Sequence, residues 1–379
     1  MPPTLPNQRD FFDIPHDLAW INCAAQSPAL SSVSLAGAEG LARKRSPWTL
    51  GPSQYRDDVE KLRGLFAELI GATAGDISFG PSASYCLSTA AQNLTIEPGS
   101  RIVVLADQFP SHVYPWRYVT ARDGGELITV PRPEDGDWAR AVLDVLDERV
   151  AVLALPQHHW TDGGLVDLER IAPVARSCGA ALVLDLSQTI GAVPVDVRQL
   201  QPDFLCCVGF KWLLGPYSLS FLYSAPHRQS GVPLEQAWSS RADSHLADII
   251  DYRDDFLPGA RRYDMGERGN YIAIPMAIAA LEQIQAWRPT SIAATLRQKT
   301  CEIATRAREL GLWPTPEAAR APHIIGLRCP IGLPNGLIER LQADRIYISQ
   351  RKGTLRISPH LYNTNSDVDR LFEALGRMI

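Results

Sequence analysis

From about residue 56 onward, short apolar segments alternate with longer amphipathic ones, and this alternation leaves few folds open to the chain. The apolar segments are rich in β-branched residues and are apolar at successive positions rather than at every second one. Strands of this kind are buried on both faces, as in a parallel sheet covered by helices. The predicted strands of this type are Ile102–Leu105, Leu127–Val130, Val150–Leu155, Ala181–Leu184 and Phe204–Val208.

The segments between these strands have helical spacing of Leu, Val and Ala behind acidic first turns, notably Asp137–Glu148 and Asp167–Cys178. Together they predict an α/β domain with right-handed crossovers. One more strand, Ser218–Ser224, follows the Gly215-Pro216 turn too closely for a helical crossover. We therefore expect that strand to be antiparallel.

The pattern changes after residue 262, where two long helices are predicted at Tyr271–Trp287 and Pro289–Leu310. Short strands and helices follow to the end of the chain. We therefore predict an N-terminal arm over 1–20, a large α/β domain over 21–262 and a small α+β domain over 263–379.

Composition limits the classes of partner. With 45% hydrophobic and 21% charged residues, the sequence is that of a soluble globular protein. A net charge of −5 gives no electrostatic reason to expect nucleic acid or an anionic membrane. No apolar run approaches the ~18 residues of a spanning helix, and the N-terminus lacks the pattern of a signal peptide. The seven dispersed cysteines have no metal-binding spacing, so we expect a cytoplasmic protein without a metal.

Unusual polar residues follow three of the predicted strands. The loops concerned are Pro156–Gly163, Asp185–Gln188 and Gly209–Lys211. The carboxyl ends of parallel strands meet at one edge of a sheet, which is where open α/β sheets bind ligands. The sequence therefore predicts a site at this edge.

Lys211 and Asp185 are the most informative pair at that edge. Lys211 follows an apolar strand and is flanked by Phe210 and Trp212, so desolvation should lower its pKa and free the amine as a nucleophile. An amine that can form an imine, with a strand-end carboxylate that can hold a pyridinium nitrogen, is what pyridoxal 5′-phosphate (PLP) requires. The alternative is that Lys211 reaches solvent past the aromatic rings while Asp185 caps a helix.

An anion site is predicted where Phe79–Ser84 opens a helix, because Ser82 and Ser84 place hydroxyls and free N–H groups at its positive end. Ordinary capping by serine is the alternative. Phe109 follows the strand Ile102–Leu105 and reaches the same edge, unless it is a core aromatic residue.

With these residues assembled, the chain resembles the class V aminotransferase family of fold-type I PLP enzymes, whose relatives include kynureninase and the cysteine desulfurases. The resemblance runs from about residue 18 to the C-terminus. It implies a mostly parallel seven-stranded sheet sandwiched by helices, and a homodimer with its active sites at the interface. The motifs that carry it are Asp185–Gln188, Gly209–Pro216 and Leu355–Thr364.

The resemblance also implies roles for individual residues. Lys211 would be the Schiff-base lysine and Asp185 the partner of the pyridine nitrogen. Arg356 would hold a substrate carboxylate, which suits its planar fork. The other implied cofactor contacts are Gln188 and His159 (or a neighbour in the 157–160 loop) at the ring oxygen, Phe109 stacked on the ring, and Ser82, Ala83 and Ser84 around the phosphate.

The chain also departs from the family pattern. Val208 and Phe210 stand where members commonly place phosphate donors. Glu267 lies in the stretch where the partner subunit usually adds a hydroxyl, and Asn270 or Arg268 is the expected substitute. Residues 335–355 contain no cysteine, so sulfur transfer is not expected.

The expected function is a PLP enzyme acting on an amino acid or related amine, with transamination as the first choice. The same residues also serve β-elimination, Cβ–Cγ hydrolysis as in kynureninase, and epimerisation. A different hypothesis is a non-catalytic ligand-binding or regulatory protein on this scaffold. A nucleotide-binding enzyme is disfavoured because no Gly-rich phosphate loop follows a strand.

Overall fold

A seven-stranded sheet forms the centre of the protein. The computed structural model describes residues 2–242 and 250–379. The strand order is β2-β8-β7-β6-β5-β3-β4. The strands from β3 to β7 pair in parallel, whereas β8 is antiparallel to both β2 and β7, which confirms both predictions. The strands are β2 Ile77–Gly80, β3 Arg101–Leu105, β4 Glu126–Val130, β5 Val150–Pro156, β6 Ala181–Asp185, β7 Phe204–Val208 and β8 Ser220–Ser224.

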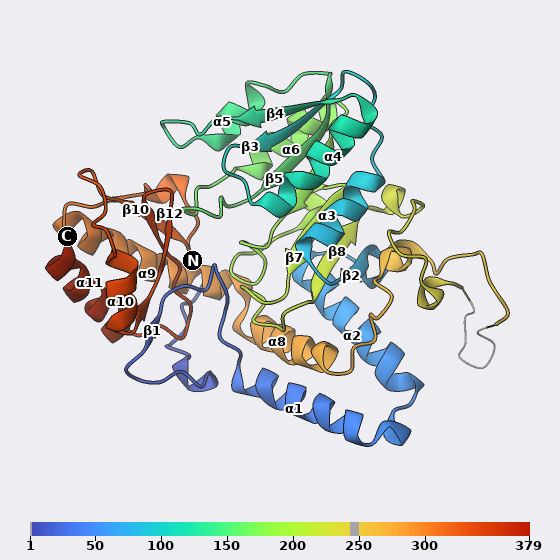
Figure 1. Ribbon diagram of the computed structural model, residues 1–379, viewed down its shortest axis with the longest axis horizontal. Helices are drawn as coiled ribbons and strands as arrows, with labels where there is room; N and C mark the ends of the chain where they lie inside the picture. Colours follow the sequence, from blue (N-terminus) through green and yellow to red (C-terminus); the bar gives the residue numbers. More distant parts are fainter. Residues whose placement is uncertain (1, 243–249) are drawn as a thin grey trace.

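Helices cover both faces of this sheet (Figure 1). Successive strand residues point to opposite faces, so Val103 and Leu105 enter one core while Ile102 and Val104 enter the other. Burying each such side chain is worth about 1.5–3 kcal/mol. The first core is closed by α2 (Pro52–Ile70), α5 (Trp138–Leu143), α6 (Leu168–Ser177) and α8 (Ala273–Trp287), the second by α3 (Ala83–Gln92) and α4 (Tyr114–Asp123).

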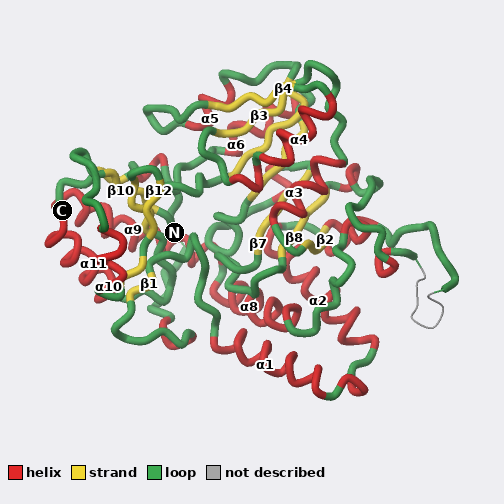
Figure 2. The backbone as a smooth tube through the Cα atoms, viewed as in Figure 1, coloured by secondary structure: helices red, strands yellow, loops and turns green. Residues whose placement is uncertain are grey.

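A second, antiparallel sheet has the order β12-β13-β10-β9 (Figure 2). One of its faces packs on helices, with Ile325, Leu327 and Leu355 in a core of their own. The alternate residues face the other way. The elements of this part are α9 Pro289–Glu309, β9 Trp313–Pro314, β10 Ile325–Arg328, α10 Leu337–Ala343, β12 Ser349–Arg351, β13 Thr354–Ile357 and α11 Asn365–Met378.

The N-terminal segment joins this C-terminal part. Strand β1 (Ala19–Trp20) pairs in parallel with β11 (Ile346–Tyr347), and Asn22 bridges to Ser358. Helix α8 instead shares the core of the large sheet. The three-part division at residues 20 and 262 stays a prediction.

Helix α1 (Ser31–Arg45) was not predicted from the sequence. It buries mainly Val33, Gly37 and Gly40, and it packs along α8. A Cβ at Gly40 would lie 2.5 Å from the carbonyl oxygen of Tyr271, so only glycine permits this approach. Within the described residues, no helix is long and apolar enough to cross a membrane.

Candidate active site

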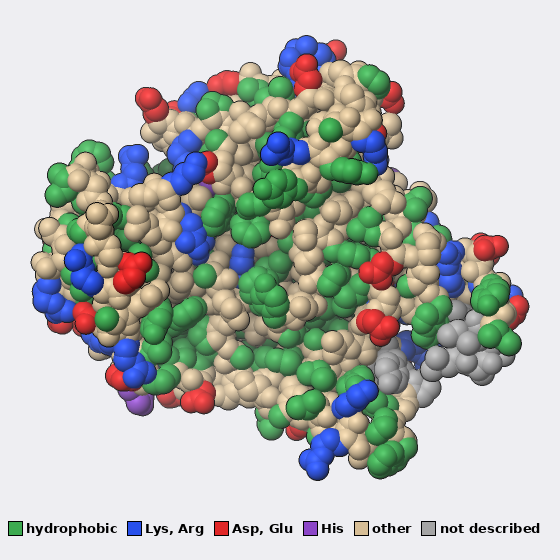
Figure 3. All heavy atoms as spheres, in the orientation of Figure 1, with side chains coloured by type: hydrophobic (Ala, Val, Ile, Leu, Met, Phe, Trp, Pro, Cys, Tyr) green, Lys and Arg blue, Asp and Glu red, His purple; other side chains and the backbone are tan. Residues whose placement is uncertain are grey.

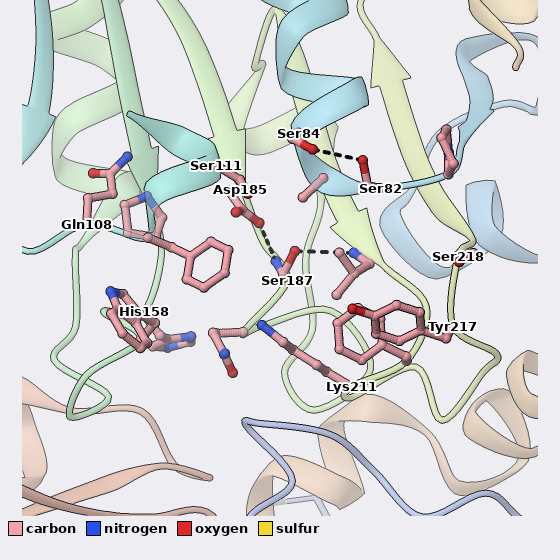
Figure 4. Close-up of a pocket in the computed structure, with 18 residues that line it drawn as sticks. Ser82, Ser84, Gln108, Ser111, His158, Asp185, Ser187, Lys211, Tyr217 and Ser218 are labelled. Atoms are coloured by element: carbon pink, nitrogen blue, oxygen red, sulfur yellow. Dashed lines mark hydrogen bonds between the residues drawn. The ribbon is translucent and has the colours of Figure 1, made fainter. Parts of the chain in front are cut away.

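A pocket opens at the carboxyl edge of the sheet (Figure 4). It lies where the loops after four neighbouring strands meet the start of α3 and the turn before β8. This is the edge that the sequence predicts. The lining residues come from the segments at the ends of these elements: Pro81–Ser84 at the start of α3; Gln108, Phe109 and Ser111 after β3; Pro156, His158 and Trp160 at the end of β5; Asp185, Ser187 and Gln188 at the end of β6; Val208, Phe210 and Lys211 at the end of β7; and Tyr217 and Ser218 in the turn before β8.

The amine of Lys211 reaches into this pocket without a hydrogen bond or ion pair to any described residue. It lies 5.3 Å from the ring centroid of Phe109 and 5.7 Å from that of Phe210. Burial lowers the pKa of Lys211 to about 8; the Asp185 carboxylate opposes this shift and the Arg356 guanidinium adds to it. A substantial fraction of this amine is therefore neutral near physiological pH.

Asp185 lies on the opposite side of the pocket from Lys211 (Figure 4). Its side chain is buried, and its Oδ1 accepts a hydrogen bond from the backbone N–H of Ser187 at 3.0 Å. The Ser187 hydroxyl in turn accepts one from the N–H of Val208 at 3.2 Å, which ties the ends of β6 and β7 together. Within the described chain, Oδ2 of Asp185 has no hydrogen-bond partner.

Gln188 lines the pocket with its amide already oriented by neighbours. Its Nε2 donates to the carbonyl of Ala24 at 2.9 Å, and its Oε1 accepts from the indole of Trp212 at 2.8 Å. The Nε2 atom of His323 lies 2.6 Å from the backbone carbonyl oxygen of Gln188. One N–H of the Gln188 amide remains for a ligand.

The predicted anion cradle lies at the N-terminus of α3. Ser82 caps this helix, since its hydroxyl accepts from the N–H of Tyr85 at 3.1 Å, and it lies 2.9 Å from the hydroxyl of Ser84. Capping and anion binding are thus compatible here. Ser218, for which no role was predicted, adds a further hydroxyl to the lining. The sequence signal that could have identified Ser218 is its position in the turn after Gly215-Pro216, close to Lys211.

One predicted contact is placed elsewhere, and the one expected from the partner subunit stays a prediction. His159 points away from the pocket, stacked on Trp138 with ring centroids 5.3 Å apart, and His158 lines the pocket instead. Adjacent side chains of an extended segment point in opposite directions, so only one of the two neighbouring histidines can face the pocket. Asn270 lies outside this chain's own pocket, because its Oδ1 caps α8 by accepting from the N–H groups of Ile272 and Ala273 at 3.0 Å each.

Arg356 is buried close to the pocket, though it does not line it. It donates to the carbonyl of Trp160 at 2.8 Å and to the hydroxyl of Ser349 at 3.3 Å, while its Nε has no partner among the described atoms. Burial lowers its pKa to about 9. A buried guanidinium without a carboxylate is costly, so this one is suited to an anionic ligand.

These groups fit PLP. The pocket offers an amine with no partner among the described residues, a buried carboxylate, and a helix N-terminus with two serine hydroxyls for a phosphate. Phe109 and Val208 provide apolar surface for a ring. The donor set therefore matches each part of that cofactor.

Comparison with known proteins agrees with this geometry. The family model for class V aminotransferases matches residues 45–239, just over half of the chain. An uncharacterised aminotransferase from Bacillus subtilis is 23% identical over 86% of this chain and 85% of its own length. Isopenicillin N epimerase from Streptomyces clavuligerus is 27% identical over 84% of both chains. The apo structure of a cysteine desulfurase from Thermococcus onnurineus superposes with a TM-score of 0.86 at 19% identity, covering 100% and 99% of the two chains.

The fold and the pocket define a fold-type I PLP enzyme. The chain belongs to the class V aminotransferase family, as the motifs around Asp185, Lys211 and Arg356 predict. Its cofactor is PLP, and its fold class is confirmed.

Proposed function

We propose that this protein is an aminotransferase in which Lys211 carries the cofactor and handles the substrate's Cα proton. Bound PLP supplies an aldehyde for the amine and an electron sink for the bond that breaks at Cα. The observation that carries the proposal is the Lys211 amine, which has no partner in the described structure and shares its pocket with a buried carboxylate.

Each remaining residue has a task in this proposal. Lys211, with its pKa lowered to about 8, is the base that would take the proton from Cα and pass it on to the cofactor. Asp185 holds the ring nitrogen in its protonated form, and Arg356 fixes the substrate carboxylate. Ser82 and Ser84 hold the phosphate, with Ser218 in place of the donors missing at Val208 and Phe210.

The relatives also support a second candidate reaction, epimerisation, since isopenicillin N epimerase aligns over 84% of this chain. Sulfur transfer is not proposed. The β12–β13 hairpin turns through Lys352 and Gly353 without a cysteine, and Cys329 is absent from the pocket lining. β-Elimination and Cβ–Cγ hydrolysis use the same groups, so product identification after incubation with amino acids decides among the reactions.

We also propose a homodimer. Leu35, Leu41, Tyr114 and Tyr118 are all more than half exposed, which is costly on a monomer surface. A partner subunit would cover such residues and bring its Asn270 toward this pocket. The seven free cysteines, four of them buried, fit the reducing cytoplasm that we propose as its location.

Reduction with borohydride tests the central assignment. The chain has five lysines, at 44, 61, 211, 299 and 352, so peptide mapping of the fixed cofactor has few candidates. We expect PLP on Lys211 in the native protein, and none on the chain in a Lys211→Ala variant that retains its circular dichroism. PLP fixed at another lysine would refute the proposal. A colourless protein that takes up no PLP would favour the non-catalytic hypothesis.

A further inference from the structure

The small-domain sheet presents three arginines on one face. Arg328 on β10 and Arg351 on β12 both lie opposite Thr354 of the central strand β13. Arg356 is two residues along β13, opposite Ser349. Residues opposite one another, or two apart, share a face of a sheet. All three arginines therefore project from the face that does not pack on the helices.

This face is turned toward the large domain, across a cleft. Asp107, Thr161 and Asp162 line the cleft on one side, and Arg328 and Arg351 line it on the other. Figure 3 shows Lys and Arg side chains gathered along the hollow between the C-terminal part, at the left, and the large domain. The cleft lining holds four basic and four acidic residues, so what it can bind depends on which of these charges are already paired.

The three arginines have no carboxylate partner within the described residues. The other cations of the cleft are paired: Arg132 binds Asp162 at 2.6 Å, and Lys352 binds Asp107. Arg351 donates one N–H to the carbonyl of its neighbour Gln350, at 2.8 Å, and its buried Nε has no partner among the described atoms. Asp135, a third acid of the cleft, pairs with Arg140, and the fourth, Glu134, makes no ion pair to Arg351 within the described residues. Arg351 therefore keeps capacity for an anion.

Trp160 joins this cleft to the cofactor pocket. Trp160 lines the pocket, and the guanidinium of Arg351, which lines the cleft, lies over the Trp160 ring, 5.4 Å from its centroid. Its carbonyl accepts from Arg356. Arg351 and Arg356 therefore meet the same residue, one on its side chain and one on its backbone. Stacking on an indole holds a guanidinium in place while leaving its N–H edge open.

We propose that the substrate carries a second anionic group, with its α-carboxylate on Arg356 and its distal carboxylate, or an equivalent anion, on Arg351. Trp160 forms the wall between the two positions. This inference rests on the proposed function, because it assigns the α-carboxylate to Arg356. It narrows the substrate class to acidic amino acids and amino acids with an anionic substituent.

Calorimetry with two unreactive acids tests this assignment. Glutarate and valerate both contain a five-carbon chain without an amine, and they differ in the second carboxylate. On the PLP-loaded protein we expect glutarate to bind about 10-fold more tightly than valerate, the effect of one added charge-assisted contact. Arg351→Gln should bring the ratio close to one, and Arg351→Lys should retain part of it. Arg340→Gln is the matched control, because Arg340 is exposed on α10 and away from the cleft.

The outcomes separate this inference from the proposed function. Equal binding of the two acids, or binding of neither, overturns the second anion position. So does a glutarate preference that persists in Arg351→Gln. If the preference behaves as expected but PLP is not fixed on Lys211, the anion position stands and the proposed function falls. If PLP is fixed on Lys211 and glutarate has no advantage, only the inference falls.

Discussion

The ionisation of Lys211 leads to a sharp test of the site. Burial lowers its pKa from 10.5 to about 8, a difference of 2.5 that corresponds to a roughly 300-fold weaker hold on its proton. At pH 7.5 about a quarter of the amine is then neutral, against about one part in a thousand for an exposed lysine. That neutral fraction is what allows the amine to act as a nucleophile and a base.

Two neighbouring charges affect this pKa in opposite directions. Asp185 favours the ammonium form and Arg356 disfavours it. We therefore expect Asp185→Asn to lower the pKa of Lys211 further and Arg356→Gln to raise it. The opposite signs are informative, because a pocket that is merely opened to water would raise the pKa in both variants.

Nuclear magnetic resonance of the PLP-free protein can follow this titration. Reductive ¹³C-methylation labels the five lysines and the terminal amine, and a Lys211→Met variant identifies the signal. The variant is needed because burial also lowers the pKa of Lys299. A Lys211 signal that titrates near 10.5, or two variants that shift it the same way, would refute the reasoning.

Stability should depend on pH through the same group. The unfolded chain holds the Lys211 proton up to pH 10.5 and the folded chain only up to about 8. The unfolded state binds more protons between these values, so the folded state gains stability as pH rises through that window. Below about pH 8, Lys211→Met should therefore unfold at a higher urea concentration than the native sequence, and the difference should shrink toward pH 10.5.

Two further predictions concern packing. Asp264→Asn should lower the free energy of unfolding by about 3 kcal/mol in urea titrations. The fully buried Arg63 would lose the buried carboxylate 2.9 Å away and keep only the partly exposed Glu60, 3.1 Å away, as a counter-charge. A loss below about 1 kcal/mol would contradict this. Gly40→Ala should lower the free energy of unfolding by about 1–3 kcal/mol, because the added Cβ would be packed too tightly against the start of α8. Gly64→Ala is the control and should be neutral or stabilising, because its Cβ would meet nothing within 4 Å. Equal effects of the two changes would show that the contact between α1 and α8 can relax.

The large sheet was predictable because its strands are apolar on both faces. Ile102–Leu105 and Phe204–Val208 contain no polar residue, and the two cores on either side explain why. Helix α1 escaped prediction for the opposite reason: it packs through glycines and leaves Leu35 and Leu41 exposed, so it has no apolar stripe to detect. The predicted helix over 137–148 ends at Leu143.

The site was predictable to the extent that topology determines it. Lys211, Asp185 and Gln188 follow neighbouring parallel strands, so their meeting follows from strand order. The choice between His158 and His159 depends on which way one side chain points, which the sequence does not encode locally. The hydrogen bonds that orient Gln188 come from Ala24 and Trp212, one of them 164 positions away, and no short pattern reveals such a contact.

The pairing of β1 with β11 has a consequence for biosynthesis. Residues 19–24 take most of their backbone partners from residues 345–358, and Ala24 is also one of the two residues that orient Gln188. During translation the large sheet can assemble first, since domains fold as units while the chain emerges from the ribosome. The region around residues 19–24 must then wait until almost the whole nascent chain has been released. We therefore expect cofactor capture to be a late event in the maturation of this enzyme, and we expect prematurely terminated chains to lack a complete site.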